Sequence, residues 1–253
     1  MSLLDALAIC AAGVWAGVVN TVVGSGTLIT FPVLLAVGYA PLTANVSNSL
    51  GLVPGSVSGA IGYRRELAGQ GSRIARFAPV SALGAVAGAA LLLLLPASAF
   101  EAIVPVFIAA ALALVVAQPR IDRWLVRRRA GAEGPPHGGR AALAGNALTA
   151  VYGGYFGAAQ GIMLLALLGV ALDDDLQRVN ALKNVLAGLV NFVAAVVFVL
   201  VGRHLAWGAV ALLAAGSTAG GQLGARLGRR LPAPALRAAI VVVGLAAIAK
   251  LVL

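Results

Sequence analysis

The stretch "NTVVGSGTLITFP" (residues 20–32) lies inside the first long apolar segment and decides how this chain is organised. Residues 4–38, as one continuous helix, would extend about 52 Å at 1.5 Å per residue, whereas the hydrocarbon core of a bilayer is about 30 Å thick. Gly24 and Gly26 free the backbone at this point, and Ser25 and Thr27 can compete for its hydrogen bonds. The stretch therefore predicts a break within a membrane helix.

The composition of the whole chain is that of an integral membrane protein. Hydrophobic residues make up 61% of its 253 residues and charged residues only 10%, whereas about 25% of residues are charged in soluble domains. Apolar windows of about 19 residues recur along the chain, as expected for helices that cross a bilayer. We therefore predict an all-α, multi-pass fold with about eight transmembrane segments.

The formal net charge of +10 comes from 18 cationic residues, which lie almost entirely in short loops between apolar segments. This distribution reflects membrane topology and does not indicate a nucleic-acid-binding surface. The single cysteine, Cys10, lies in an apolar run, so no internal disulfide is predicted. No metal or other cofactor is predicted either.

Two halves of the chain repeat the same order of segments. At an offset of 135, Gly26 falls on Gly161 and Asn45 on Asn180, and at 136 the pair Gly84 and Gly88 falls on Gly220 and Gly224. A nearly constant offset over about 120 residues indicates an internal duplication. The predicted organisation is a first membrane repeat at 1–117, a basic cytoplasmic linker at 118–140 and a second membrane repeat at 141–253.

The relative orientation of the repeats depends on how each interrupted first segment is counted. If it crosses once, the halves are parallel, and 12 cationic residues lie on one face against five on the other. If it is a re-entrant hairpin, the halves are inverted, and 15 lie on the linker side while only Arg203 and Lys250 lie opposite. The positive-inside rule favours inverted repeats, with the parallel arrangement as the alternative.

The second half carries its own break in "YGGYFGAAQGIM" (residues 152–163). Non-helical backbone at membrane depth needs protein or a water-filled cavity beside it, and paired breaks in two halves indicate the binding site of a transporter. We expect the half-helices that begin at about Thr27 and Ile162 to point free N–H groups and positive dipole ends into one space. Such ends attract an anion.

Polar residues follow each break at helical spacing. The first half has "TANVSNS" and the second has "RVNALKNVLAGLVN", in which Lys183 is the one charged residue after Arg178 and lies in an otherwise uncharged membrane segment. Amides, hydroxyls and an ammonium group suit an oxyanion, and intramembrane charges are functional candidates; Lys183 could instead snorkel to the surface. The predicted substrate-binding residues are Gly24, Ser25, Gly26, Thr27, Asn45, Asn48, Ser49, Gln160, Gly161, Asn180, Lys183 and Asn184.

Signatures of catalysis were sought without success. "GSGT" lacks the lysine and spacing of a phosphate-binding loop, and neither H-E-x-x-H nor G-x-S-x-G occurs. The consecutive aspartates at 173–175 point in different directions and are interpreted as a solvated loop and helix cap. The chain is therefore predicted not to be an enzyme.

The chain resembles the TauE/SafE family of sulfite and organosulfonate exporters over nearly its whole length. The resemblance is carried by "GVVNTVVGSGTLITFPVLLAVGYAPLTANVSNS" (17–49), "YRRE" (63–66), "GAVAGAALLLLLP" (84–96) and "RVNALKNVLAGLVNFVAAVVFVLVGRHLAWG" (178–208). It implies transport of a small sulfur-containing or organic oxyanion, such as sulfite or a sulfonate, across the bacterial inner membrane. Asn48 stands at the position that corresponds to Lys183, so a pseudo-symmetric cleft would be asymmetric in charge.

Residues and resemblance together predict a secondary transporter that moves a small anion by alternating access. The alternatives are a passive anion channel with the same two half-helices and, with less support, an intramembrane enzyme or a structural subunit. The expected partners are a small anionic substrate and the lipid bilayer, with no nucleic acid, and homo-oligomer formation is left open.

Overall fold

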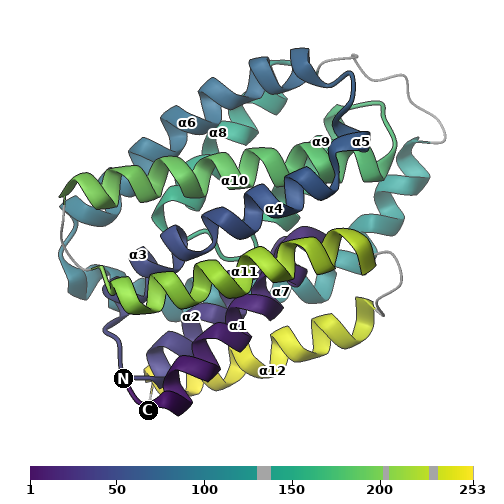
Figure 1. Cartoon of the computed structure of the whole chain (residues 1–253). Helices are drawn as coiled ribbons and strands as arrows, with labels where there is room; N and C mark the ends of the chain where they lie inside the picture. The colour runs from purple at the N-terminus through teal and green to yellow at the C-terminus, as the bar shows by residue number, and fades with distance from the viewer. Residues whose placement is uncertain (130–137, 202–204, 228–232, 253) are drawn as a thin grey trace.

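The computed structural model describes residues 1–129, 138–201, 205–227 and 233–252. Within these ranges the regular elements are all α-helices, which confirms the predicted all-α fold (Figure 1). Their bounds are α1 Leu3–Val22, α2 Thr27–Ala36, α3 Pro41–Gly51, α4 Val53–Gly62, α5 Arg64–Leu67, α6 Gly71–Leu94, α7 Ala97–Arg129, α8 Arg140–Tyr155, α9 Gln160–Ala171, α10 Leu176–Val201, α11 Trp207–Leu227 and α12 Ala233–Val252.

Four of the described helices, α1, α6, α7 and α10, are long and apolar enough to cross a membrane. Shorter apolar helices occur at Thr27–Ala36, Gln160–Ala171 and Leu236–Ala249. The chain is thus a multi-pass membrane protein. Linker residues 130–137 and Arg203, which enters the charge comparison, lie outside the described residues.

The apolar run at 43–62 is divided between two helices, α3 and α4, which meet at Leu52. Pro54, in the first turn of α4, has no N–H group and its ring clashes with the carbonyl four residues earlier, so a single straight helix cannot pass through it. In addition, α7 continues to Arg129, through the first part of the predicted linker.

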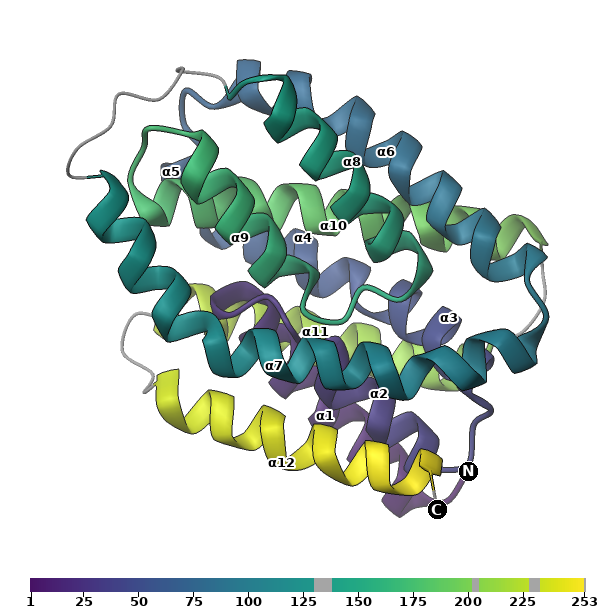
Figure 2. The same ribbon diagram turned by 180° about the vertical axis from the view of Figure 1, so that it is seen from behind.

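The first segment of each half is a helical hairpin. At the open end of the α1–α2 hairpin, the hydroxyl of Tyr39 lies 3.9 Å from Sδ of Met1. At the open end of the α8–α9 hairpin, Ala142 and Leu172 pack in one cluster with Phe77, at the start of α6. Figures 1 and 2 show that these two open ends lie at opposite ends of the bundle and that both bends lie near its middle.

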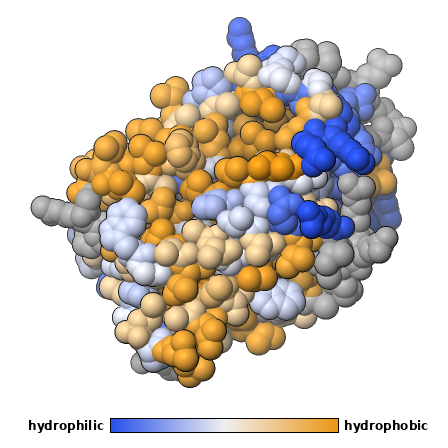
Figure 3. All heavy atoms as spheres, in the orientation of Figure 1, coloured by the Kyte–Doolittle hydropathy of each residue, from blue (hydrophilic) through white to orange (hydrophobic). Residues whose placement is uncertain are grey.

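The bundle has one basic end, defined here by Arg64, Arg65, Arg73, Arg178 and Arg237. In Figure 3, hydrophilic residues gather at this end, whereas hydrophobic residues dominate the rest of the visible surface. A band of lipid-facing apolar residues with arginines gathered at one end is typical of a protein that spans a bilayer.

Small residues bring the outer helices against the hairpins. A Cβ added at Gly84 in α6 would lie 2.7 Å from Cβ of Ala150 in α8, and one at Gly224 in α11 would lie 3.0 Å from Cα of Val18 in α1. These distances leave no room for a side chain, so glycine at these positions allows the helices to pack closely. The two glycine-mediated contacts hold both broken segments inside the bundle.

Candidate functional site

Both breaks are present and have the same backbone geometry. Gly24 and Gly157 have φ of 89° and 76°, which favours glycine because it lacks a Cβ. The N–H of Gly24 donates to the carbonyl of Val19 at 2.8 Å, and the N–H of Gly157 donates to the carbonyl of Tyr152 at 3.1 Å. Each bond reaches back five residues, one more than in an α-helix, and closes the last turn of the first helix of its hairpin.

The register between the breaks differs from the predicted one. Gly157 follows Gly24 by 133 positions, and Gln160, which begins α9, follows Thr27 by the same number. The predicted offset of 135 and the predicted start of the second half-helix at Ile162 are therefore wrong at the breaks. The reason is a difference in helix length, because α9 has 12 residues and α2 has 10.

The two breaks touch each other in the middle of the bundle. The N–H of Gly161 donates to the carbonyl of Gly24 at 3.0 Å. A Cβ added at Gly161 would lie 2.5 Å from Cα of Gly24, so only glycine permits this approach. A ligand therefore cannot lie directly between the two glycines in this conformation, and the available space lies beside them.

The free N–H groups expected at the half-helices are largely occupied. In α9, the N–H groups of residues 160–163 all donate to backbone carbonyls. In the first half, the N–H of Gly26 donates to Oδ1 of Asn20 at 2.7 Å, and those of residues 28–30 donate to the carbonyls of Ser25 and Gly26. The tight turns that form the breaks satisfy these groups, so the attraction for an anion must come from helix dipoles and side chains.

A small polar cavity lies beside the contact between the breaks. Its volume is about 20 Å³, which is enough for about one water molecule. It is lined by Asn20, Thr21, Gly24, Thr27, Ser56, Gly157, Gln160, Gly161, Lys183, Asn184, Ala187 and Asn191. Six of the twelve predicted site residues are among them: Gly24, Thr27, Gln160, Gly161, Lys183 and Asn184.

Lys183 is 1% exposed, so its ammonium group stays inside the bundle and does not snorkel to the surface. Its Nζ donates to the carbonyl of Asn20 at 3.1 Å. From the same helix, Nδ2 of Asn180 and Nδ2 of Asn184 approach the carbonyl of Thr21 at 3.3 and 3.4 Å. Because the last carbonyls of a broken helix have no intrahelical partner, α10 supplies donors to the end of α1.

The first half makes a related arrangement with the end of α8. Nδ2 of Asn45 donates to the carbonyl of Tyr155 at 2.9 Å. Asn48 instead bonds within its own half, where Nδ2 donates to Oγ1 of Thr27 at 3.2 Å and Oδ1 accepts from the hydroxyl of Thr30. The hydroxyl of Ser49 donates to the carbonyl of Asn45 in its own helix. These residues therefore support the breaks, and none of the three predicted residues from α3 lines the small cavity.

Several buried polar atoms near the breaks have no hydrogen-bond partner among the described residues. They are Oγ of Ser25, Oδ1 of Asn45, Nε2 of Gln160 and Oδ1 of Asn180. The Nδ2 bonds of Asn45 and Asn180 to helix carbonyls fix the orientation of both amides, because the reverse orientation would place two oxygens together. Gln160 is 3% exposed and lines the cavity, so its Nε2 is a buried donor suited to an acceptor that enters there.

Sequence reasoning did not select Asn20, Thr21 and Ser56, and it noted Asn191 and Gly157 without assigning them to the site. Asn20 opens the quoted stretch, and its side chain spans the break by accepting from Gly26. Asn191 follows Ser56 by 135 positions, which is the offset between the predicted repeats. A comparison of the two repeats could therefore have identified both residues. Thr21 contributes through its backbone carbonyl, which no side-chain pattern reveals.

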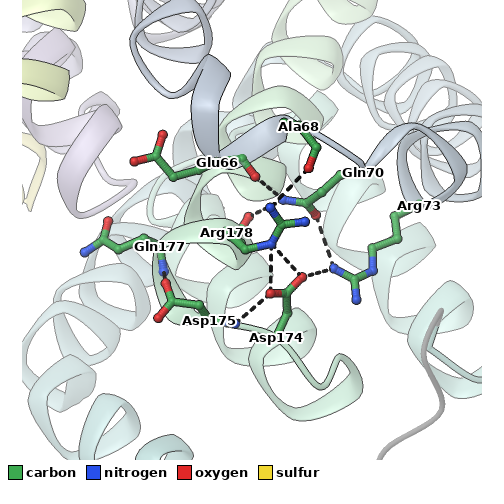
Figure 4. A network of polar contacts seen from close by, with 8 residues as sticks. All are labelled: Glu66, Ala68, Gln70, Arg73, Asp174, Asp175, Gln177 and Arg178. Atoms are coloured by element: carbon green, nitrogen blue, oxygen red, sulfur yellow. Dashed lines mark hydrogen bonds and ion pairs between the residues drawn. The ribbon is translucent and has the colours of Figure 1, made fainter.

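At the basic end, a polar network joins the two halves (Figure 4). Asp174 accepts from Nε of Arg178 at 2.9 Å and pairs with Arg73, while Nε2 of Gln70 donates to the carbonyl of Arg178 at 2.9 Å. Burial alone would raise the pKa of Asp174, but the hydrogen bonds from Arg73 and Arg178 hold it below its usual value. Asp175 accepts from the N–H of Gln177 at 2.7 Å, which confirms the predicted helix cap before α10.

Broken helical hairpins that meet at a buried polar cavity, inside an apolar helical bundle, define a multi-pass membrane protein of the transporter class. Residues 9–251 match the family described as "Sulfite exporter TauE/SafE", and the chain belongs to this family. The assignment covers both hairpins and every residue that lines the cavity.

Curated relatives agree with this assignment. The chain is 25% identical, over 237 residues, to the "Probable membrane transporter protein YfcA" of Escherichia coli strain K12, and the match covers 93% of this chain and 85% of that protein. The same protein from strains O6:H1 and O157:H7 matches to the same extent. No solved structure gives a significant match. Family and relatives point to a membrane transporter and not to an enzyme.

Proposed function

We propose that this protein moves a small oxyanion, such as sulfite or a sulfonate, across the bacterial inner membrane by alternating access. The observation that carries the proposal is the pairing of two groups in one buried cavity. Lys183 supplies a positive charge there, and Nε2 of Gln160 is a buried donor without a partner among the described residues. An oxyanion would compensate the charge and accept the unused hydrogen bond.

The surrounding backbone supports an anion over a cation. The first turns of α2 and α9, at Thr27 and Gln160, both line the cavity, and the N-terminus of a helix carries a partial positive charge. No carboxylate is among the lining residues of the described cavity. The hydroxyl of Thr27 accepts from Nδ2 of Asn48 and can donate a neutral hydrogen bond to such an anion, whereas the hydroxyl of Ser56 donates to the carbonyl of Leu52.

Inverted repeats are part of the proposal. The α1–α2 and α8–α9 hairpins open at opposite ends of the bundle. Asn45 donates to the last turn of α8 and Asn180 donates to the last turn of α1, so each amide reaches the break in the other half. This exchange supports two halves that rock against each other around a central site, with the basic end in the cytoplasm.

A cavity of about 20 Å³ is smaller than any sulfur oxyanion, because it holds about one water molecule. The conformation described here is therefore interpreted as a closed state, in which the site is assembled but too small to hold the substrate. Substrate entry would require α4 or α10 to move away from the hairpins, since both helices contribute to the cavity wall through Ser56 and Lys183.

The main test is anion flux into proteoliposomes, combined with thermal unfolding of the purified protein. Sulfite, methanesulfonate, acetate and sodium ions form the ligand panel, and a ligand at 100 times its Kd stabilises by about 2.7 kcal/mol. We expect Lys183→Ala to abolish both sulfite flux and sulfite-dependent stabilisation. Arg76→Ala, which removes the same charge from an exposed position at the basic end, should retain both. Unchanged flux in Lys183→Ala would exclude its assigned role.

A passive channel remains the rival function, because the same cavity could conduct an anion without a conformational cycle. A counterflow experiment distinguishes a transporter from a channel. A transporter preloaded with unlabelled sulfite accumulates labelled sulfite transiently, whereas a channel does not. Absence of counterflow, with intact sulfite permeability, would favour the channel.

A further inference from the structure

An apolar groove lies on the outside of the bundle between α4 and α10, and we call it the α4–α10 groove. Its volume is about 450 Å³, and its walls are almost entirely apolar. Val57, Ile61 and Phe192 line it and are each more than half exposed, so the groove opens on the surface that faces lipid. Figure 1 shows α4 and α10 side by side in front, and Figure 3 shows mainly hydrophobic residues over the same face.

The length of the α4–α10 groove matches one leaflet of a membrane. On the α4 side it runs from Val53 to Arg64, and the eleven steps between these residues extend about 16 Å at 1.5 Å per residue. Half of the hydrocarbon core of a bilayer is about 15 Å. A single acyl chain that starts at the membrane surface would therefore reach the inner end of the groove at mid-membrane.

The charge at the outer end of the α4–α10 groove indicates which lipid headgroup it would bind. Arg64 is exposed at the basic end and takes part in no ion pair or hydrogen bond among the described residues. Arg65 is its neighbour in sequence but is not part of the groove wall. A basic side chain at the interface attracts anionic headgroups, so the phosphate of an anionic phospholipid complements this end.

The inner part of the α4–α10 groove meets the small polar cavity. Ser56 and Asn184 line both spaces, so these two side chains form the partition between them. Gly188 keeps the partition thin, because a Cβ added there would lie 3.0 Å from Cβ of Ser56. Whatever occupies the groove is therefore the outer wall of the candidate anion site.

We propose that one acyl chain of an anionic phospholipid occupies the α4–α10 groove, with its phosphate at Arg64, and that this chain seals the side of the anion site against the bilayer. The role as a seal rests on the proposed transport function, whereas the binding of the lipid does not. An apolar chain in the groove removes apolar surface from contact with water or detergent, and the ion pair with Arg64 fixes the position of the headgroup.

The experiment measures thermal unfolding of the full-length protein in detergent, without any anion substrate, as phosphatidylglycerol is added. Phosphatidylcholine with the same acyl chains is the reference lipid. We expect phosphatidylglycerol to raise the midpoint more than phosphatidylcholine. Arg64→Gln should weaken its apparent affinity about fivefold, which corresponds to about 1 kcal/mol for one basic residue near the surface. Arg65→Gln is the matched control and should leave the affinity unchanged.

A second variant tests the groove itself. Ala60→Phe fills it, and should abolish the stabilisation by phosphatidylglycerol, whereas Leu83→Phe, at a lipid-facing position on α6 outside the groove, should retain it. Equal stabilisation of Ala60→Phe and the unmodified protein would overturn the proposal, as would equal losses in Arg64→Gln and Arg65→Gln.

Native mass spectrometry of the same samples should detect bound lipid, and a dimer that disappears in Ala60→Phe would instead identify a second copy of the chain as the occupant. Because no anion is present, these outcomes are independent of whether the protein transports sulfite.

Discussion

Gln160→Met should increase the stability of the unliganded protein while it weakens anion binding. Methionine keeps the length and the unbranched shape of glutamine but removes Nε2, which is buried at the cavity without a partner among the described residues. An unsatisfied buried donor costs about 1–3 kcal/mol. Its removal should raise the midpoint of thermal unfolding by roughly 2–4 °C for each kcal/mol gained in a chain of this size.

The same substitution should weaken anion binding, although it stabilises the unliganded protein. A hydrogen bond to a charged acceptor contributes about 1.5–3 kcal/mol, so the loss of Nε2 should raise the Kd for sulfite roughly 10- to 150-fold. Thermal unfolding with and without a sulfite series measures both quantities on one sample. Higher stability of the unliganded protein together with weaker sulfite binding is expected of a site residue whose donor is unused. It is not expected of a residue with a purely structural role.

Gln222→Met is the matched control, because Nε2 of Gln222 donates to the carbonyl of Ser58 at 3.0 Å. This substitution leaves that carbonyl without its partner and should lower stability by about 1 kcal/mol, with no change in anion affinity. If Gln160→Met instead lowers stability as Gln222→Met does, or if it binds sulfite normally, the assignment of Gln160 as an anion donor is refuted.

Two further substitutions test the contact between the breaks and the network at the basic end. Gly161→Ala places a Cβ 2.5 Å from Cα of Gly24 and should cost about 1–3 kcal/mol through overpacking; Gly71→Ala, which has open space around it, should be neutral in the same thermal assay. Asp174→Asn should lower stability at neutral pH by up to about 1 kcal/mol, a range typical of partly exposed ion pairs. Because the folded-state pKa of Asp174 is lowered, its contribution is present above the unfolded value of 3.8 and is lost as pH falls through the folded value. Chemical denaturation at pH 7 and pH 3 should therefore show a smaller pH dependence in Asp174→Asn, and an unchanged one would contradict the lowered pKa.

The sequence predicted the breaks because their cause is local. A membrane helix cannot be 35 residues long without a tilt or a break, and glycine is the residue that tolerates the left-handed conformation seen at Gly24 and Gly157. Polar residues in an apolar segment were equally visible, since ionisable and amide side chains within a membrane segment, such as Lys183 and Gln160, are functional candidates. These features follow from composition and length, which need no knowledge of neighbouring helices.

The partners of the polar groups were not predictable in this way. The contact between Gly161 and Gly24 and the bonds from α10 to the end of α1 join residues more than 100 positions apart. Sequence reasoning also placed free N–H groups at both half-helices, because it treated each break in isolation. The tight turns and Asn20 occupy most of those groups.

By itself, the sequence determined that the chain is a helical membrane protein with a basic side, two broken segments and one lysine within a membrane segment, because hydrophobicity and glycine act through the chain's own backbone. Only the tertiary structure decided that the breaks touch, that their register is 133, and that Lys183 and Gln160 line the same cavity. The physical reason is that a buried polar group takes whichever partner folding brings within about 3 Å, and for Asn45, Asn180 and Lys183 that partner comes from the other half of the chain.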